Sequence, residues 1–384
     1  MNYCFFSAQY LPTFGGIERF THNIAKELIE RGDVAVVVTS ALPNIAAHEV
    51  DENGIEIYRV PSILALKGRL PIALPGKKFR KAARAALAKA DRVVIQTRFY
   101  PLSFLAASAC RKAQKPYIIV EHGAGHLSLG GGLIDWCVQS YEHFFCWLLK
   151  RKTPAFYTVS EAGGEWLRHF GIQSSGVLYN FIDPVSIEDQ TRGRTANAIR
   201  VQYNLPQDRP LVLFTGRLVE EKGILSLVEA IKALQNEPIP PVLAIAGAGP
   251  LEATLRAEPN CIRVLGTLPQ SEVFALLKTA EVFCLPSKSE GMSTSVLEAA
   301  ACGCYVVTTA VGGSKELISG PIYGTILRDD APQTIAQALK QILDDEGVRK
   351  SAAQAAQQKV NVRFTKAATC TALQNIPWGQ FSAY

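Results

Sequence analysis

The sequence predicts an α/β protein with two doubly wound domains, each built on a parallel sheet. The chain has 384 residues, more than one hydrophobic core usually serves. Short β-branched runs alternate with helical periodicity through the first half, and the alternation restarts near residue 211. Residues 185–198 are polar without an apolar period, so we expect them to link a first domain, residues 1–184, to a second, residues 198–365. Residues 366–384 are expected to pack back on the first domain.

The composition is that of an ordinary globular protein, with 48% hydrophobic and 19% charged residues. Nine cysteines without a C-x-x-C pair are typical of reduced thiols, not of a disulfide framework or a zinc site. The N-terminus lacks the basic segment of a signal peptide, and no run is long enough for a transmembrane helix. Residues 1–183 carry 21 Lys and Arg against 15 Asp and Glu, which accounts for the net charge of +6. We therefore expect a cytoplasmic protein with an anionic partner on its first half.

The first half contains six predicted strands, each followed by a turn or a loop. They span residues 3–8, 34–39, 92–96, 116–120, 156–160 and 177–179. Gly15 and Gly16 stand between the first strand and the first helix, where a backbone without Cβ atoms can approach a phosphate. An ordinary tight turn would also explain this pair of glycines. Residues 49–60 are expected to form a hairpin around Asn53–Gly54.

A basic helix is expected within residues 67–92. One face carries Lys77, Lys78, Arg80, Lys81, Arg84 and Lys89. The other face is thinly apolar, with Phe79, Ala83 and Leu87. A helix of this kind can lie on an anionic lipid surface. A solvated surface helix is the alternative.

Two histidines, His122 and His126, follow the strand at residues 116–120, at the strand end where α/β proteins bind ligands. Their spacing of four residues would suit a metal pair only on a helix, and the intervening Gly123 and Gly125 argue against one. Residues 133–149 form an aromatic-rich helix whose charged residues exclude a membrane span.

The second half has five predicted strands, at residues 211–215, 242–246, 262–265, 282–285 and 305–308. The loop after the first of these contains Arg217 and Lys222, two cations that could clamp a diphosphate. Both could equally be surface cations beside the adjoining acidic residues. Residues 247–250, GAGP, lack the third glycine of a dinucleotide fingerprint, so no nicotinamide site is expected.

Residues 281–303, EVFCLPSKSEGMSTSVLEAAACG, are predicted to form a strand, a polar loop and a helix ending near Gly303. The free N–H groups of the helix start favour an anion. Glu290 in the loop and Glu298 in the helix are placed to reach the sugar end and the ribose of one ligand. Alternatively, Ser295 and Glu298 have the spacing of a capping box.

Taken together, seven segments resemble the retaining glycosyltransferases of family 4, over nearly the whole chain. They are GGIERF, EHG, VSE, YNFID, FTGRLVEEKG, LAIAGAGP and SEGMSTSVLEAAACG. The resemblance implies the GT-B fold, with two Rossmann-like domains facing a central cleft. It also implies a nucleoside-diphosphate sugar on the second domain and a glycan or lipid-linked acceptor on the first.

The resemblance also implies roles for individual residues. Catalytic roles fall to His122, Glu290, Arg217 and Lys222. Donor binding falls to Gly15, Gly16, Gly216, Gly291, Met292, Ser293, Thr294 and Glu298. His126, Ser160 and Asn180 are acceptor-side candidates, and His126 also competes with His122 as the site histidine.

No Asp-x-Asp motif occurs in a credible site loop, so we expect no metal and no other cofactor. In a retaining transfer on this fold, the departing phosphate itself would help to take the acceptor's proton. The alternatives are a nucleotide-sugar epimerase on the same fold and a non-catalytic basic binding protein. Nucleic acid is not expected, because the basic segment lacks interleaved aromatic residues. An anionic membrane surface on the cytoplasmic side is a further expected partner of residues 67–92.

Overall fold

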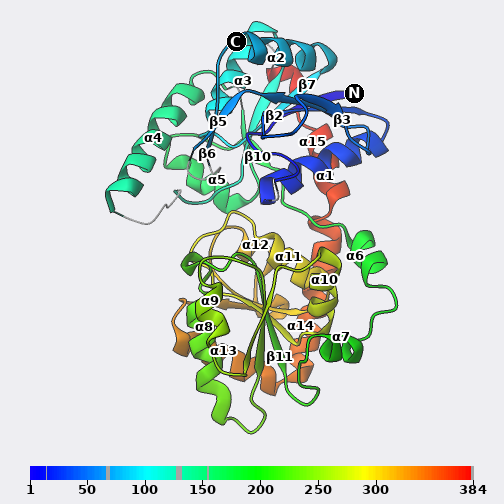
Figure 1. Ribbon diagram of the computed structural model, residues 1–384, viewed down its shortest axis with the longest axis vertical. Helices are drawn as coiled ribbons and strands as arrows, with labels where there is room; N and C mark the ends of the chain where they lie inside the picture. Colours follow the sequence, from blue (N-terminus) through cyan, green and yellow to red (C-terminus); the bar gives the residue numbers. More distant parts are fainter. Residues whose placement is uncertain (14, 66–69, 127–131, 154, 382–384) are drawn as a thin grey trace. The chain divides into compact units, whose positions relative to one another are not determined.

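The computed structural model describes residues 1–13, 15–65, 70–126, 132–153 and 155–381, and it divides into two compact units (Figure 1). Unit 1 comprises Met1–Asn180 and Lys366–Tyr384, and unit 2 comprises Phe181–Thr365. Each unit is a mainly parallel sheet with connecting helices, which confirms the predicted fold class.

Unit 1 is built on an eight-stranded sheet with the order β10-β9-β8-β7-β1-β2-β4-β3. The strands are β1 (Asn2–Phe6), β2 (Val34–Ser40), β3 (His48–Val50), β4 (Glu56–Val60), β7 (Arg92–Gln96), β8 (Tyr117–Glu121), β9 (Phe156–Thr158) and β10 (Gly176–Val177). Only β3 is antiparallel, and it forms the expected hairpin with β4. The central strand β1 pairs with β2 on one side and β7 on the other, so the strand order reverses there.

Helices cover both faces of the unit 1 sheet. They are α1 (Gly16–Glu30), α2 (Lys77–Lys89), α3 (Pro101–Lys112), α4 (Gly132–Lys150), α5 (Glu161–Arg168) and α15 (Lys366–Gln374), followed by the 3₁₀ helix η5 (Trp378–Phe381). Cys4 and Phe6 of β1 lie in the core that includes α2 and α3. The C-terminal α15 packs on α1, where the Arg31 guanidinium donates to the Ala367 carbonyl and to Thr371, at 3.0 Å each.

Unit 2 has a six-stranded parallel sheet with the order β13-β12-β11-β14-β15-β16. Its strands are β11 (Leu211–Thr215), β12 (Val242–Ala246), β13 (Ile262–Gly266), β14 (Val282–Leu285), β15 (Tyr305–Thr309) and β16 (Thr325–Leu327). Numbered along the unit, this is the 3-2-1-4-5-6 order of a Rossmann sheet. The order reverses between β11 and β14, which pair directly.

Unit 2 has helices on both sides of its sheet. The α-helices are α6 (Pro184–Thr191), α7 (Ala196–Gln202), α8 (Ile224–Ala233), α9 (Glu252–Arg256), α10 (Gln270–Thr279), α11 (Thr294–Ala301), α12 (Ser314–Leu317), α13 (Pro332–Asp344) and α14 (Glu346–Arg363). Three 3₁₀ helices are η2 (Glu220–Lys222), η3 (Leu234–Asn236) and η4 (Pro321–Tyr323). Figure 1 shows α8, α9 and α13 on one side of the sheet and α10, α11 and α14 on the other.

The structure corrects the predicted linker at residues 185–198. This stretch lies in α6, in α7 and in the turn between them, within unit 2. Asp183 caps α6 by accepting from the Ser186 N–H, and Ile187 and Ile199 are buried. These two apolar side chains are too few to show a helical period among polar neighbours. The sequence therefore predicted a linker instead of two helices.

The structure also corrects the apolar face assigned to the basic helix. Phe79, Ala83 and Leu87 of α2 are buried in the unit 1 core, so they are not available to enter a lipid surface. Residues 67–69 of the predicted basic segment lie outside the described residues. The short hairpin of β5 (Ser62–Ala65) and β6 (Leu70–Ala73) was not expected. No helix in the described part of the chain is long and apolar enough to cross a membrane.

Candidate active site

The best-formed candidate site in unit 2 lies where the strand order reverses. The loop after β11 carries Lys222, and the loop after β14 carries Glu290. Because β11 and β14 are parallel neighbours, both loops leave the same carboxyl edge of the sheet. This switch point is where open α/β sheets bind ligands.

Lys222 and Glu290 are in direct contact. The Lys222 ammonium is 2.5 Å from Glu290 Oε1, and the Ser287 hydroxyl donates to the same oxygen at 2.8 Å. The two charged side chains are 19% and 12% exposed. Among the described residues Glu290 Oε2 has no hydrogen-bond partner. One carboxylate oxygen therefore anchors the side chain, and the other remains able to accept from a ligand hydroxyl.

Close backbone packing holds the two loops in place. Gly223 has a φ of +69°, and a Cβ built on it would lie 2.1 Å from the Pro286 carbonyl oxygen. The Lys288 N–H donates to the Glu221 carbonyl at 2.8 Å, which joins the two loops a second time. Only glycine fits this approach of two backbones. The position of Lys222 beside Glu290 is thus set by the fold itself.

Arg217, near the start of the same loop, has a different environment. Its guanidinium is exposed and has no hydrogen-bond or ion-pair partner among the described residues. The structure does not bring Arg217 into contact with Lys222. The predicted two-cation clamp on a diphosphate remains a prediction. Gly216 precedes Arg217 with a φ of +148°.

The start of α11 offers backbone N–H groups at the same edge of the sheet. The helix begins at Thr294 after Ser293, as predicted, and no side chain caps it in the structure. Ser295 stands inside the first turn and not at the N-cap, which is the position that a capping box of Ser295 and Glu298 requires. Glu298 is buried and accepts from the Gln270 amide of α10 at 3.2 Å. This leaves the first-turn N–H groups of α11 suited to an anion.

The loop residues between Glu290 and α11 are tightly placed. Met292 and Ser293 are buried, and the Gly313 N–H donates to the Gly291 carbonyl at 2.7 Å. Ser287, Gln270 and Gly313 were not predicted. The bonds of Gln270 to Glu298 and of Gly313 to Gly291 join residues more than 20 positions apart, so they leave no spacing signal, and Ser287 lies three residues before Glu290 in the same polar loop.

Unit 1 has a comparable arrangement after its central strand. The loop after β1 leads to Gly15 and Gly16, and α1 begins at Gly16 without a side-chain cap. A Cβ built on Gly16 would meet no atom within 4 Å, so the space beside it is open. Glu18, in the first turn, is buried, and burial raises the pKa of its carboxyl. Glu18 was not singled out from the sequence, although it belongs to the GGIERF motif.

His122 follows β8 in unit 1. Its Nε2 is 2.7 Å from the amide oxygen of Gln96, at the end of neighbouring β7, and its ring meets the Phe20 ring of α1 at 5.0 Å. Burial lowers the pKa of His122 to about 4, against the opposing effect of Glu121. The imidazole is therefore neutral at pH 7 and suited to hydrogen bonding.

His126 belongs to a different set of contacts. Its Nδ1 lies 3.0 Å from Glu142 Oε2 on α4, and the buried Arg98 guanidinium joins Glu142, at 3.1 Å, to Glu121, at 2.8 Å. No direct contact links His126 to His122 in the described structure. Arg98, Glu121 and Glu142 form a buried charge network that the sequence did not indicate.

Ser160, an acceptor-side candidate, has a structural role in unit 1. Ser160 is fully buried and caps α5, with its hydroxyl accepting from the Gly163 N–H at 3.0 Å. A capping hydroxyl with no exposed surface stabilises the helix start, and the acceptor role of Ser160 remains a prediction. Asn180, the other candidate, is the last residue of the first segment of unit 1 and is buried.

Comparison with known proteins agrees with this architecture. Residues 14–185 match the family described as Glycosyltransferase Family 4, and residues 195–359 match Glycosyl transferases group 1. The chain is 29% identical over 330 residues to the putative teichuronic acid biosynthesis glycosyltransferase TuaC of Bacillus subtilis, covering 84% of this chain and 80% of that protein.

A second relative is the D-inositol 3-phosphate glycosyltransferase of Xylanimonas cellulosilytica, 32% identical over 358 residues, covering 87% of this chain and 85% of that protein. The structure is similar to that of HepE from Anabaena, solved in complex with UDP and glucose, with a TM-score of 0.76 and 18% identity over 97% of this chain and 98% of that one. The chain belongs to the family 4 glycosyltransferases and has their GT-B fold.

Proposed function

We propose that this glycosyltransferase is a retaining enzyme that moves a sugar from a nucleoside-diphosphate sugar to a lipid-linked or polysaccharide acceptor. The observation that carries the proposal is the Lys222–Glu290 pair at the β11–β14 switch point, beside the uncapped start of α11. HepE, which shares the fold, was solved with UDP and glucose.

The diphosphate would meet positive charge from two sources. A lysine ammonium has three donors, so Lys222 can keep its bond to Glu290 and give another N–H to a phosphate oxygen. Arg217, exposed on the same loop, supplies a second cation. As the bond between sugar and phosphate breaks, negative charge grows on the leaving diphosphate, and fixed cations stabilise that charge. These protein cations support donor binding that needs no metal ion.

Carboxylates would hold the two sugars of the donor. Glu290, fixed through Oε1, would accept from the transferred sugar's hydroxyls through Oε2. Glu298, fixed by Gln270, would accept from the ribose hydroxyls. A carboxylate accepts from two adjacent hydroxyls with little rearrangement when its own side chain is already held.

Unit 1 has residues of its own that suit this reaction. Gly15 and Gly16 stand at the uncapped start of α1, whose N–H groups favour a phosphate. His122 would hydrogen-bond the transferred sugar as a neutral imidazole, and the departing phosphate would take the acceptor's proton. His126 and Asn180 remain acceptor-side candidates.

The surface of α4 supports a lipid-linked acceptor at a membrane. Trp136, Phe144 and Trp147 of this helix are exposed, and the Arg151 guanidinium stacks on Trp147 at 3.8 Å. Aromatic residues beside cations are typical of segments that lie at a lipid–water interface. The cations of α2 would add electrostatic attraction without insertion, because the apolar face of that helix is buried.

Two vesicle measurements separate these contributions. Replacing Trp136 and Phe144 by Ser is expected to weaken binding to anionic vesicles at every salt concentration. Replacing Lys77 and Lys78 by Gln is expected to weaken it mainly at low salt, because exposed charges are screened. Unchanged partitioning in both variants would exclude the membrane proposal.

The donor is identified by screening UDP-, GDP- and ADP-sugars for a rise in melting temperature. Release of the nucleoside diphosphate then measures turnover with a lipid-linked or glycan acceptor. The anomeric configuration of the product, read by NMR, tests retention, and an inverted product would refute it. Conversion of the nucleotide sugar to its epimer without an acceptor would favour the epimerase alternative.

A further inference from the structure

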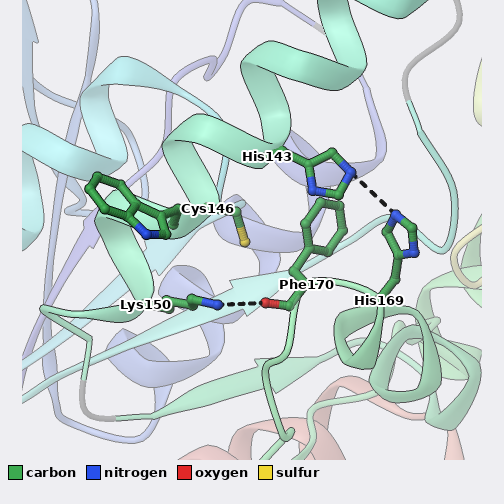
Figure 2. Close-up of a pocket in the computed structure, with 6 residues that line it drawn as sticks. His143, Cys146, Lys150, His169 and Phe170 are labelled. Atoms are coloured by element: carbon green, nitrogen blue, oxygen red, sulfur yellow. Dashed lines mark hydrogen bonds between the residues drawn. The ribbon is translucent and has the colours of Figure 1, made fainter.

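Three of the chain's six histidines gather in unit 1, outside the donor site. His126 lies in the loop after β8, His143 on α4, and His169 directly after α5. One ring nitrogen from each lies within 4.8 Å of the other two. Figure 2 shows His143 and His169 directed at each other beside a pocket. Their Nε2 atoms form a hydrogen bond of 3.3 Å. Three imidazoles from three separate segments therefore converge on one point.

The spacing suits a tetrahedral metal ion. With Zn–N bonds of about 2.0–2.1 Å, two nitrogens of a tetrahedral site lie roughly 3.3–3.4 Å apart. The His143–His169 distance already has this value. The His126 ring supplies a third nitrogen within 4.8 Å of the other two.

His126 has the supporting contact of a metal-binding histidine. Its Nδ1 faces the Glu142 carboxylate at 3.0 Å, so the proton sits on Nδ1 and the lone pair on Nε2. Glu142 is buried and held by Arg98. A carboxylate behind the ring fixes the tautomer and makes the ligating nitrogen more basic.

Aromatic packing orients the other two rings. His169 stacks on Trp166, with centroids 5.0 Å apart and planes 8° from parallel, and His143 packs on Phe170 at 4.8 Å. His143 and His169 are exposed, so an ion can reach the cluster from solvent. Lys150, which also lines the pocket, donates to the Phe170 carbonyl at 3.1 Å (Figure 2).

We propose that His126, His143 and His169 bind a zinc ion, with water in the fourth position. Three imidazoles and an open position are an established zinc coordination set. The proposal is independent of the donor site and changes the expectation that the chain holds no metal. The ion would tie the loop after β8, which also carries His122, to α4 and α5.

The test uses the full chain without a histidine tag, stripped with EDTA and dialysed against zinc. We expect one zinc per chain, a higher melting temperature with zinc, and visible absorption typical of tetrahedral coordination when cobalt(II) replaces zinc. His143→Ala and His169→Ala should each weaken zinc binding at least about 10-fold, because even an outer contact of a metal site is worth that much. Both residues are exposed, and the melting temperatures of the metal-free variants show whether they remain folded.

Two control variants should bind zinc as the wild type does. His48→Ala removes an exposed histidine paired with Glu56, far from the cluster in sequence, and Cys137→Ser removes an exposed thiol on α4. The proposal is overturned if the stripped chain takes up no stoichiometric zinc. Equal zinc binding by His143→Ala and the wild type would overturn it as well.

Discussion

Breaking the Lys222–Glu290 pair from each side tests whether it acts in turnover or only in packing. Lys222→Met keeps the length of the side chain and removes the charge, whereas Glu290→Gln keeps the shape and removes the other charge. The double variant removes both charges and leaves no unpaired ion. The three variants and the wild type form a double-mutant cycle.

The structure sets the expected magnitudes. Exposed ion pairs contribute about 0–1 kcal/mol, while removing one partner of a fully buried pair costs about 3–5 kcal/mol. With side chains 19% and 12% exposed, we expect Lys222→Met to lower the free energy of unfolding by about 2 kcal/mol. The double variant should recover much of that loss. Removing a group that stabilises transition-state charge costs about 100-fold or more in kcat, so turnover should fall in all three variants.

The assay compares chemical unfolding with the rate of nucleoside-diphosphate release. Lys340→Met is the matched control, because Lys340 forms a pair of similar length, 2.7 Å, with Glu237 on an exposed surface. It should change neither stability nor turnover appreciably. If the double variant regained turnover together with stability, the pair would be structural only. Wild-type turnover in both single variants would refute the site.

Three other substitutions give separate tests. Gly223→Ala should lower the free energy of unfolding by at least about 2 kcal/mol, because alanine at positive φ would be strained and its Cβ would meet the Pro286 carbonyl. Urea unfolding measures this loss, and an unchanged urea midpoint would contradict the loop packing. The pKa of His122 is lowered to about 4, so the unfolded chain takes up a proton that the folded protein does not, and stability should fall as pH drops from about 6.5 to 4. His122→Asn should flatten that dependence in urea unfolding curves, and an equally steep fall in the variant would refute the assignment. Ser160→Ala should lower the free energy of unfolding by about 0.5–2 kcal/mol through loss of the α5 cap, with turnover of the folded protein unchanged. A selective loss of acceptor binding would instead support the predicted contact of Ser160 with the acceptor.

Much of the fold was predictable because parallel strands and their helices leave strong local signals. The start of α11 at Thr294 and the chain reversal at Gly303, with φ +75°, follow from a polar loop before an apolar helix and a glycine after it. The hairpin of β3 and β4 follows from Asn53–Gly54 between alternating residues. Helices α6 and α7 were not predicted, because each buries few side chains on a largely polar helix. The β5–β6 hairpin and the short strand β16 were not predicted either.

The candidate site was predictable as a set of residues but not as a set of contacts. Spacing placed Lys222 and Glu290 in two loops at strand ends, yet it could not show that the two loops leave neighbouring strands. That adjacency depends on the order of the sheet, which local sequence does not encode. For the same reason, the sequence did not show that His143 and His169 lie close to His126. The three histidines belong to separate segments, which the packing of α4 and α5 within unit 1 brings together.

The two cations of the β11 loop differ in what they can contribute before any ligand arrives. Lys222 is held by a carboxylate and a packed backbone, so its charge is fixed in space and costs little further ordering when a phosphate binds. Arg217 is exposed and unpartnered among the described residues, so its side chain would have to be ordered when an anion binds. Its charge attracts an anion at long range, before contact. A fixed charge suits the stabilisation of a developing charge, because no reorganisation is needed at the moment of bond breaking. An exposed charge, such as that of Arg217, would suit capture of the proposed donor from solution. The Glu290 carboxylate, which pairs with Lys222, is therefore part of the positioning, because it keeps the cation at the switch point where the proposed diphosphate would bind.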